Sequence, residues 1–328
     1  MKFVFKVIVV ILLAAGFFYF FVGRPPRAEK ITWGVYFSHR HAQNMGLDWR
    51  EAYAALLDDL KVRELRLPAY WDLTEPEEGR YDFGYLDWLL ARSSERGAKV
   101  ILVAGLKMPR WPECYAPPWA RDLGKEEQQE KLLSWLETVV LRYKDGPAIW
   151  AWQIENEPFL KFGVCPSRAS GFLKEEVDLV KKLDSRPVIV TASGEWSTWW
   201  TVSRFADIPG STLYKRVWFD VPFLPGFYAY YPFPPKFYYA KADLVRKFFD
   251  KEIIITELQA EPWGPNLLYE LPYDQHGRTM DLEKFKDMVE FARNTGLSTF
   301  YLWGSEWWYW LKTVQNDPGI WDEAGKLW

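Results

Sequence analysis

The sequence has few of the residues that metal or nucleic-acid chemistry uses. Its 328 residues include only three histidines and two cysteines, and the formal net charge is −3 with acids and bases interspersed. Histidines without a clustered ligand spacing argue against a catalytic metal, and we expect no other cofactor. The mixed charges offer no basic face for nucleic acid. No internal repeat, low-complexity tract or second domain is indicated, which leaves one domain that works with ordinary side chains.

Aromatic residues are abundant instead, with 20 Trp, 18 Tyr and 22 Phe. Large rings bury much area, and packing explains more than half of them. The clusters around Trp196, Trp199 and Trp200 and around Trp307, Trp308 and Trp310 exceed what a core of branched aliphatics requires. Because sugar rings present flat C–H faces that stack on aromatic rings, these clusters suit a carbohydrate cleft.

The first 28 residues differ from the rest by an apolar run over 3–22 that only Lys6 interrupts. About 20 such residues span a bilayer. A cleavable signal peptide is the alternative, since Ala14, Ala15 and Gly16 are small, but the aromatic stretch 17–21 prolongs the run beyond them. We favour an uncleaved transmembrane anchor with a short linker over 1–28, followed by one catalytic domain over 29–328.

Strand-like and helix-like segments alternate through residues 29–328, which indicates parallel strands joined by crossover helices. The predicted fold class is α/β, a single (β/α)8 TIM barrel preceded by a transmembrane or signal-anchor helix. Stretches 219–237 and 307–312 are interpreted as loops. Strands are expected at 31–37, 62–68, 99–106, 148–154, 187–191, 207–218, 252–257 and 298–303, and helices at 49–60, 85–96, 126–143, 168–183, 196–205, 241–249 and 282–294.

The two cysteines follow neighbouring strands, Cys114 after the third and Cys165 after the fourth. An exported domain permits a disulfide between them. Two unpaired thiols are equally compatible with the sequence, because the distance between the side chains is not encoded in their spacing.

Two acidic residues stand at strand ends a hundred positions apart. Glu157 follows the fourth strand and Glu257 ends the seventh. A (β/α)8 barrel builds its active site at the carboxyl ends of its strands, and two carboxyl groups flanking a sugar linkage are the minimum machinery for glycoside hydrolysis. Glu155 and Glu261 compete for these roles, although either suits an ordinary buried or loop carboxylate.

Asn156-Glu157-Pro158 and Thr256-Glu257 resemble the catalytic signatures of clan A glycoside hydrolases. The likeness extends over about 32–303 and is greatest to the cellulase-like family 5, with some likeness to families 39 and 42. It implies that Glu157 is the general acid/base, that Glu257 is the nucleophile, and that Asn156 donates to the sugar 2-hydroxyl.

The same resemblance assigns supporting residues. Arg66 matches an arginine near the nucleophile, or forms a salt bridge inside the barrel. Tyr214 matches a tyrosine that hydrogen-bonds the nucleophile, with Tyr230 and Tyr231 as alternatives. Trp303 matches the floor of the subsite for the reacting sugar, or plugs the barrel mouth. One departure is Thr212, because family 5 enzymes often carry histidine there.

Weaker candidates for substrate binding also follow predicted strands. They are His39, with His41 beside it, Trp71 and Glu195. Glu195 has an alternative role as a cap in the first turn of the next helix.

The sequence thus predicts a retaining β-glycosidase acting on a β-linked oligo- or polysaccharide through a glycosyl-enzyme. A transglycosylase on the same scaffold and an inactive carbohydrate-binding barrel are the alternatives. Carbohydrate is the expected partner, nucleic acid is not, and membrane contact is expected through the N-terminal helix only. Basic residues flank that helix on both sides, so charge does not decide its orientation. We expect the catalytic domain outside the cytoplasm, where polymeric carbohydrate is usually found.

Overall fold

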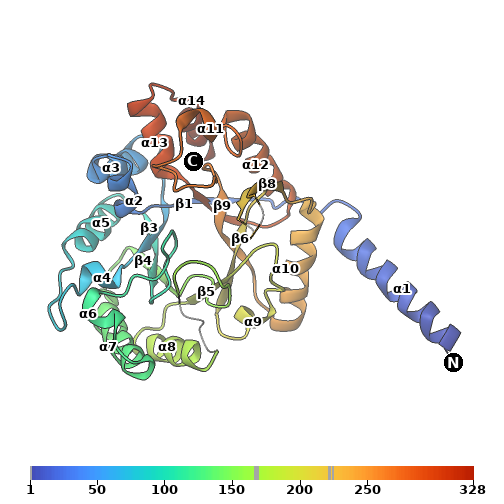
Figure 1. The fold of residues 1–328 in the computed structure, drawn as a ribbon, viewed down its shortest axis with the longest axis horizontal. Coiled ribbons are helices and arrows are strands. Elements are labelled where there is room, and N and C mark those ends of the chain that lie inside the picture. Colours follow the sequence, from blue (N-terminus) through green and yellow to red (C-terminus); the bar gives the residue numbers. More distant parts are fainter. Residues whose placement is uncertain (1, 166–169, 221–222, 224) are drawn as a thin grey trace.

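The computed structural model describes all residues except 1, 166–169, 221–222 and 224. Eight parallel strands close into a barrel in the order β1-β10-β9-β6-β5-β4-β3-β2, and helices surround them (Figure 1). The predicted (β/α)8 barrel is confirmed, with a strand at each of the eight expected positions; the sixth ends at Leu213, and residues 216–218 of the predicted range belong to a separate strand. The strands are β1 (Thr32–Tyr36), β2 (Glu64–Pro68), β3 (Lys99–Ala104), β4 (Ile149–Ile154), β5 (Val188–Ala192), β6 (Ile208–Leu213), β9 (Ile254–Gln259) and β10 (Thr299–Trp303).

The barrel strands are apolar runs because both of their faces are covered. In β3, every residue after the exposed Lys99 is buried. The buried side chains of Ile101, Ala151, Ile189, Ile254 and Tyr301 form a cluster of their own. These side chains come from β3, β4, β5, β9 and β10, so the barrel is a packed core and not a pore.

The outer ring consists of helices with one apolar face. Asp48 and Asp281 cap two of them by accepting backbone N–H groups. The longer helices are α3 (Trp49–Asp58), α5 (Gly84–Glu95), α7 (Lys125–Tyr143), α8 (Ser170–Leu183), α10 (Pro235–Phe249), α12 (Leu282–Asn294) and α13 (Ser305–Val314). The shorter ones are α2 (His39–Asn44), α4 (Trp71–Thr74), α6 (Pro118–Arg121), α9 (Trp200–Ser203), α11 (Tyr273–His276), α14 (Gly319–Ala324) and the 3-10 turn Gly325–Leu327.

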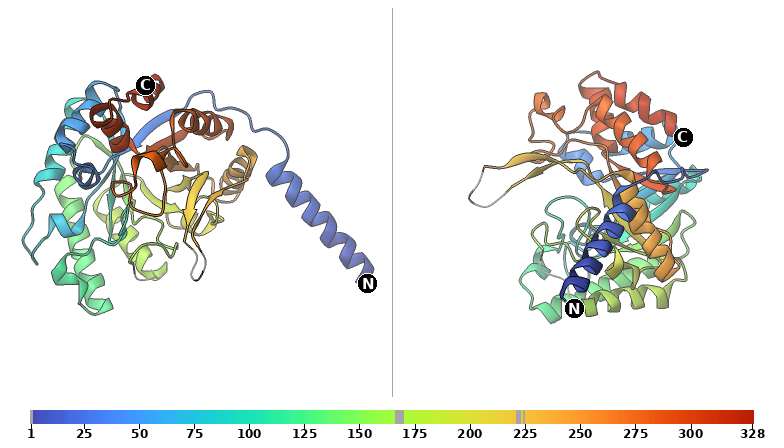
Figure 2. Two further views of the ribbon diagram at one scale, coloured as in Figure 1. Left: turned by 45° about the horizontal axis from the view of Figure 1, so that its top comes forward. Right: turned by 90° about the vertical axis from the view of Figure 1, so that its right-hand side faces the viewer.

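Two interpretations from the sequence are wrong. Residues 219–237 are not a continuous loop, because β7 (Arg216–Phe219) and β8 (Phe227–Tyr230) form an antiparallel hairpin and α10 already begins at Pro235. Aromatic side chains pair across the hairpin, with ring centres 4.8 Å apart for Trp218 and Tyr228. The hairpin projects from the barrel in Figure 2. Residues 307–312 belong to α13, whose Trp307 and Trp308 are buried. The predicted start of α8 at 168–169 lies outside the described residues.

An apolar helix, α1 (Lys2–Phe21), extends away from the barrel (Figure 1). Its segment Val4–Phe21 has a mean hydropathy of 2.5 and is long and apolar enough to cross a membrane, by length and composition alone. Such a helix is an anchor or a signal sequence. Its last turn contacts α10, where the Tyr19 hydroxyl donates to Asp243 and the ring of Phe21 lies 5.7 Å from that of Phe237.

Candidate active site

Glu257 is a buried carboxyl group held by two donors. Arg66 Nη1 donates to its Oε1 at 2.9 Å, and the Tyr214 hydroxyl donates to its Oε2 at 2.9 Å. Arg66 is itself fully buried in β2, where its other nitrogens donate to Gln153 Oε1 and Asn156 Oδ1, both at 2.7 Å. A cation on one oxygen and a hydroxyl on the other suit an ionised carboxylate that keeps a fixed orientation.

Glu157 lies three residues beyond β4 in a different environment. Its backbone N–H donates to Thr191 Oγ1 at 2.9 Å, and the Thr212 hydroxyl donates to its Oε1 at 3.3 Å. Burial, and then the negative charge of Glu257, raise the pKa of Glu157 well above its ordinary value. Two neighbouring glutamates in such different surroundings are suited to separate acid and nucleophile roles.

Asn156 shares hydrogen-bond partners with both glutamates. Its Oδ1 accepts from Arg66 and, at 3.3 Å, from the Thr191 hydroxyl. With the oxygen occupied by these donors, the amide NH₂ of Asn156 is the group that can donate to a substrate hydroxyl.

Trp303, at the end of β10, is packed on its neighbours. Its ring stacks on Tyr36 with centres 4.6 Å apart, and the Arg110 guanidinium carbon lies 4.3 Å from its ring centre. Its Nε1 donates to Glu261 Oε1 at 2.7 Å. Arg110 binds Glu261 through two hydrogen bonds of 2.7 and 2.9 Å and also lies 3.4 Å from Glu306. The wall beside Trp303 is therefore a buried ion-pair network.

The competing acids Glu155 and Glu261 are committed to structural contacts. Glu155 accepts the backbone N–H groups of Leu106 and Lys107 at 2.9 and 2.6 Å. Glu261 is occupied by Arg110 and Trp303. These contacts leave Glu157 and Glu257 as the better candidates for chemistry.

Glu195 lies behind Tyr214. Its Oε1 accepts the Tyr214 backbone N–H at 3.0 Å and the Tyr238 hydroxyl at 2.8 Å. Burial raises the pKa of Glu195. The alternative tyrosine, Tyr231, is engaged elsewhere, since its hydroxyl accepts from Trp196 Nε1 at 3.1 Å. Glu195 thus supports Tyr214, which donates to Glu257.

His39 and Trp71 lie among helix-layer residues. The His39 ring stacks on Tyr85 with centres 4.0 Å apart, and burial lowers the pKa of His39 to about 3. Trp71 is fully buried and donates to Glu75 Oε2 at 2.8 Å. The structure does not bring these two side chains to the carboxyl pair, and we do not include them in the proposed site.

Sequence reasoning missed three polar residues around the pair. Lys107 and Arg110 come from the segment after β3, and Thr212 was noted only as a departure from family 5. Position after a barrel strand could have drawn attention to Lys107 and Arg110. Their partners could not be foreseen, because these depend on how the loops after β3, β4 and β9 meet.

Aromatic rings lead from solvent toward the pair. Trp111 and Phe162 are exposed by 48% and 42%, with ring centres 6.2 Å apart. Phe162 contacts Trp263, whose ring centre lies 5.1 Å from that of Tyr214. This row suits the stacking of sugar units near the carboxyl groups.

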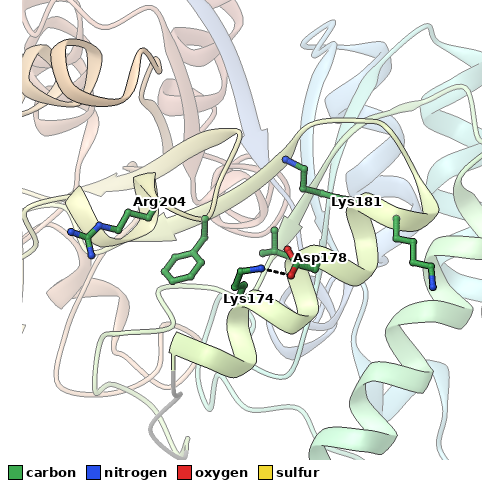
Figure 3. Close-up of a pocket in the computed structure, with 7 residues that line it drawn as sticks. Lys174, Asp178, Lys181 and Arg204 are labelled. Carbon is green, nitrogen blue, oxygen red and sulfur yellow. Dashed lines mark hydrogen bonds and ion pairs between the residues drawn. The ribbon is translucent and has the colours of Figure 1, made fainter.

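A cavity of about 550 Å³ lies elsewhere, on the outside of the barrel beside α8 (Figure 3). Its lining includes Lys174, Asp178, Lys181 and Arg204, and neither carboxyl of the pair lines it. Lys174 and Asp178 form an ion pair that Figure 3 marks. We therefore do not connect this cavity with the chemistry.

Comparison with known proteins agrees with this architecture. Residues 48–208 match the family model of glycoside hydrolase family 42, described as beta-galactosidase. Beta-galactosidase BgaA of Clostridium cellulovorans is 25% identical over 182 residues, which cover 49% of this chain and 27% of that protein.

Solved structures share the fold. The beta-galactosidase of the haloarchaeon Halorubrum lacusprofundi superposes with a TM-score of 0.55 at 15% identity, covering 83% of this chain and 52% of that one. Xylanase 10B of Thermotoga petrophila superposes with a TM-score of 0.57 at 16% identity, covering 84% and 82%.

The chain is thus a (β/α)8 barrel. Just under half of it is similar to a family of glycoside hydrolases. It spans 27% of BgaA and about half of the haloarchaeal enzyme, so the activities of those whole proteins do not transfer to it directly.

Proposed function

We propose that the protein is a retaining β-glycosidase in which Glu257 is the nucleophile and Glu157 is the general acid/base. The observation that carries this proposal is the contrast between the two glutamates. Both are buried, but the carboxylate of Glu257 is held by Arg66 and Tyr214, whereas the pKa of Glu157 is raised by burial and by the charge of Glu257. Retaining chemistry needs this division between an ionised and a protonated carboxyl.

In the first step, Glu257 forms a bond to the anomeric carbon while the glycosidic C–O bond breaks. Glu157 gives its proton to the departing oxygen, so the leaving group departs as a neutral alcohol. In the second step, Glu157 takes a proton from water, and the resulting oxygen displaces Glu257 from the anomeric carbon. The free sugar leaves, and both glutamates return to their initial protonation states.

Other residues orient the reacting sugar. The Asn156 amide donates to the 2-hydroxyl, a contact that strengthens at the transition state. Trp303 and the Arg110 network border the same subsite. Trp111, Phe162 and Trp263 offer ring faces to further sugar units.

A β-galactoside is the first substrate class to test, because the family model and BgaA carry that name. β-Xylosides and β-mannosides follow, since a xylanase and an exo-β-1,4-mannosidase share the fold. Turnover of a panel of aryl β-glycosides by the wild type and by Glu257→Gln tests the proposal, with Glu137→Gln on the surface of α7 as control.

We expect turnover by the wild type and the control, and none by Glu257→Gln. Proton NMR of the first-formed product should show the β-anomer, since two displacements retain configuration. An α-anomer would contradict the retaining mechanism. Binding of sugars without turnover would favour the inactive barrel, and transfer to added sugar acceptors in preference to water would favour a transglycosylase.

The raised pKa of Glu157 also sets a direction for pH dependence. The first step needs protonated Glu157, and the rate should fall as pH rises through its pKa.

The proposal includes membrane attachment through α1 with the barrel outside the cytoplasm, supported by the apolar character of Val4–Phe21.

A further inference from the structure

We propose that Lys107 is a positioning residue for the general acid, in that its buried ammonium group holds the backbone of residues 157–160 and thereby aims Glu157. This inference rests on the proposed function, because it assigns a partner to the acid of that reaction. Lys107 follows β3 and is 2% exposed.

The ammonium group has three polar neighbours. Lys107 Nζ donates to the carbonyl oxygens of Glu157 at 3.0 Å and Leu160 at 2.8 Å. It also lies 3.1 Å from Glu113 Oε2. An ammonium has three N–H donors and no acceptor. Two of these donors bind main-chain carbonyls of the segment that carries the acid, and Glu113 supplies the opposite charge.

That segment needs support because its backbone is unusual. Glu157 has φ 44°, in the left-handed region that residues other than glycine seldom adopt. Such a conformation persists where the surroundings over-determine it. Thr191 binds the N–H of Glu157, while Lys107 and the Leu160 N–H bind its carbonyl, the latter at 2.9 Å.

The backbone of Lys107 joins the same loops. Its N–H donates to Glu155 Oε2, and its carbonyl accepts the Asn156 N–H at 2.7 Å. A disulfide between Cys114 and Cys165 ties these loops further along, with Cα atoms 5.3 Å apart. Cys165 lies eight residues beyond Glu157 in sequence. Lys107, in contrast, connects the two loops at Glu157 itself.

The charge of Lys107 acts on the acid as well. Glu257 on β9, Glu113 on the loop after β3 and Glu195 after β5 raise the pKa of Glu157, whereas Lys107 lowers it. Loss of the ammonium should therefore both displace Glu157 and bring its pKa further up.

These effects predict a selective defect. An aryl glycoside with an activated leaving group, such as 2,4-dinitrophenolate, departs without a proton and needs little help from Glu157. A poor leaving group, such as a methoxide or a sugar alkoxide, needs the proton. Misplacing the acid should therefore lower kcat/KM, which reports the first step, only for the second kind of substrate.

The experiment compares Lys107→Met with the wild type, using full-length protein in detergent. The readout is kcat/KM for a 2,4-dinitrophenyl glycoside divided by that for the matching alkyl glycoside. We expect this ratio to rise about 10- to 100-fold in Lys107→Met, a range typical of a misaligned or missing proton donor. The alkaline limb of the pH profile should also move to higher pH.

Lys251→Met is the matched control, because Lys251 Nζ also donates to two backbone carbonyls, those of Ser203 and Ala206. It should leave the ratio unchanged. If Lys107→Met does not fold by circular dichroism, Lys107→Gln replaces it, with an amide donor in place of the charge. An unchanged ratio, or equal loss on both substrates, overturns the positioning role.

Failure of the proposed function itself would look different, since the wild type would then turn over neither substrate. In that case, NMR titration of ¹³C-labelled glutamate still tests the contact, with Glu157→Gln assigning the resonance. The Glu157 carboxyl should titrate at higher pH in Lys107→Met than in the wild type. An unmoved titration would overturn the inference.

Discussion

A fully buried arginine is tolerated in the barrel because its N–H groups have acceptors on several strands. Arg66 donates to Gln153, Asn156 and Glu257, from β4, the loop after it and β9. Unpaired buried charge would be costly, but a fully hydrogen-bonded cation fixes the groups around it. Arg66 therefore sets the positions of the proposed nucleophile and of the Asn156 amide.

Tyr214→Phe tests the second donor to Glu257. It removes one hydroxyl, which donates to Oε2 at 2.9 Å, and keeps the ring. A hydrogen bond to a charged group contributes about 1.5–3 kcal/mol, so we expect kcat to fall about 10- to 100-fold. Tyr231→Phe is the control, since its hydroxyl contacts Trp196, and it should retain nearly full activity. Equal losses in both variants would contradict this role for Tyr214.

The titration of Glu113 makes the free energy of unfolding depend on pH. Burial raises the pKa of Glu113 to about 8 from its ordinary 4.5, although Lys107 opposes this shift. Between these values the folded state holds more protons than the unfolded state, and stability from this group falls as pH rises. Glu113→Gln removes the titration and keeps an oxygen for Lys107.

We expect Glu113→Gln to match the wild type near pH 4 and to gain stability at higher pH. The gain should reach about 1–3 kcal/mol by pH 8, since one unit of pKa corresponds to about 1.4 kcal/mol. Urea unfolding from pH 4 to pH 8 measures it, with Glu137→Gln as the exposed control. A pH-independent difference from the wild type would contradict the raised pKa.

At the scale of elements, β5 and β6 must approach closely at their carboxyl ends. Gly194, just after β5, donates its N–H to Thr212 Oγ1 at 2.9 Å, and a Cβ there would lie 1.9 Å from the Thr212 carbonyl oxygen. Thr212 in turn contacts Glu157. The contact between Gly194 and Thr212 therefore also positions the proposed acid.

Gly194→Ala should destabilise the protein by about 1–3 kcal/mol, as overpacking typically does, and should lower kcat by displacing Thr212. Gly277→Ala is the control, because a Cβ there meets nothing within 4 Å. Thermal unfolding and kcat measure the two effects. A Gly194→Ala variant as stable and active as the control would show that β5 and β6 have room for a Cβ at residue 194.

The sequence predicts elements well where burial alone determines them. The strand β3 is a run of Val, Ile, Leu and Ala that suits only a strand covered on both faces. The hairpin β7–β8 is stabilised by pairing between aromatic residues, and its prolines and glycine resemble loop composition.

The candidate site, too, is predictable from the sequence only in part. Glu157 and Glu257 are found from strand ends, because parallel strands bring those ends together. Arg66 and Tyr214 are found from the resemblance to clan A glycoside hydrolases. The roles of Lys107 and Arg110 depend on contacts between loops with no periodic pattern. His39 and Trp71 also follow strands, yet their side chains turn toward the helices, and a sequence position does not encode that direction.

At the scale of the whole molecule, the barrel and α1 are connected by a linker that packs on the barrel. In that linker, Arg27 donates to Asn294 Oδ1 at 3.0 Å and pairs with Glu290. An apolar helix held beside a barrel in this way suits an anchor that keeps the enzyme near a membrane surface.

Retention of α1 follows from the uncleaved-anchor proposal. We expect the full-length protein to stay in the membrane fraction after an alkaline carbonate wash and to dissolve in detergent. Its intact mass should include residues 2–21, and a chain beginning at residue 29 should be soluble and active. A mature protein that starts after the apolar run would identify a cleaved signal peptide instead.

The orientation of the barrel can be tested separately, because the basic residues on either side of α1 do not decide it. Lys2 and Lys6 precede the apolar segment, while Arg24, Arg27 and Lys30 follow it. If the barrel acts on carbohydrate outside the cytoplasm, protease added to sealed cells whose surface is accessible should digest it. A cytoplasmic marker protein should survive the same treatment. Full protection of the barrel, followed by digestion once the cells are lysed, would place the enzyme inside and direct the search for its substrate to intracellular glycosides.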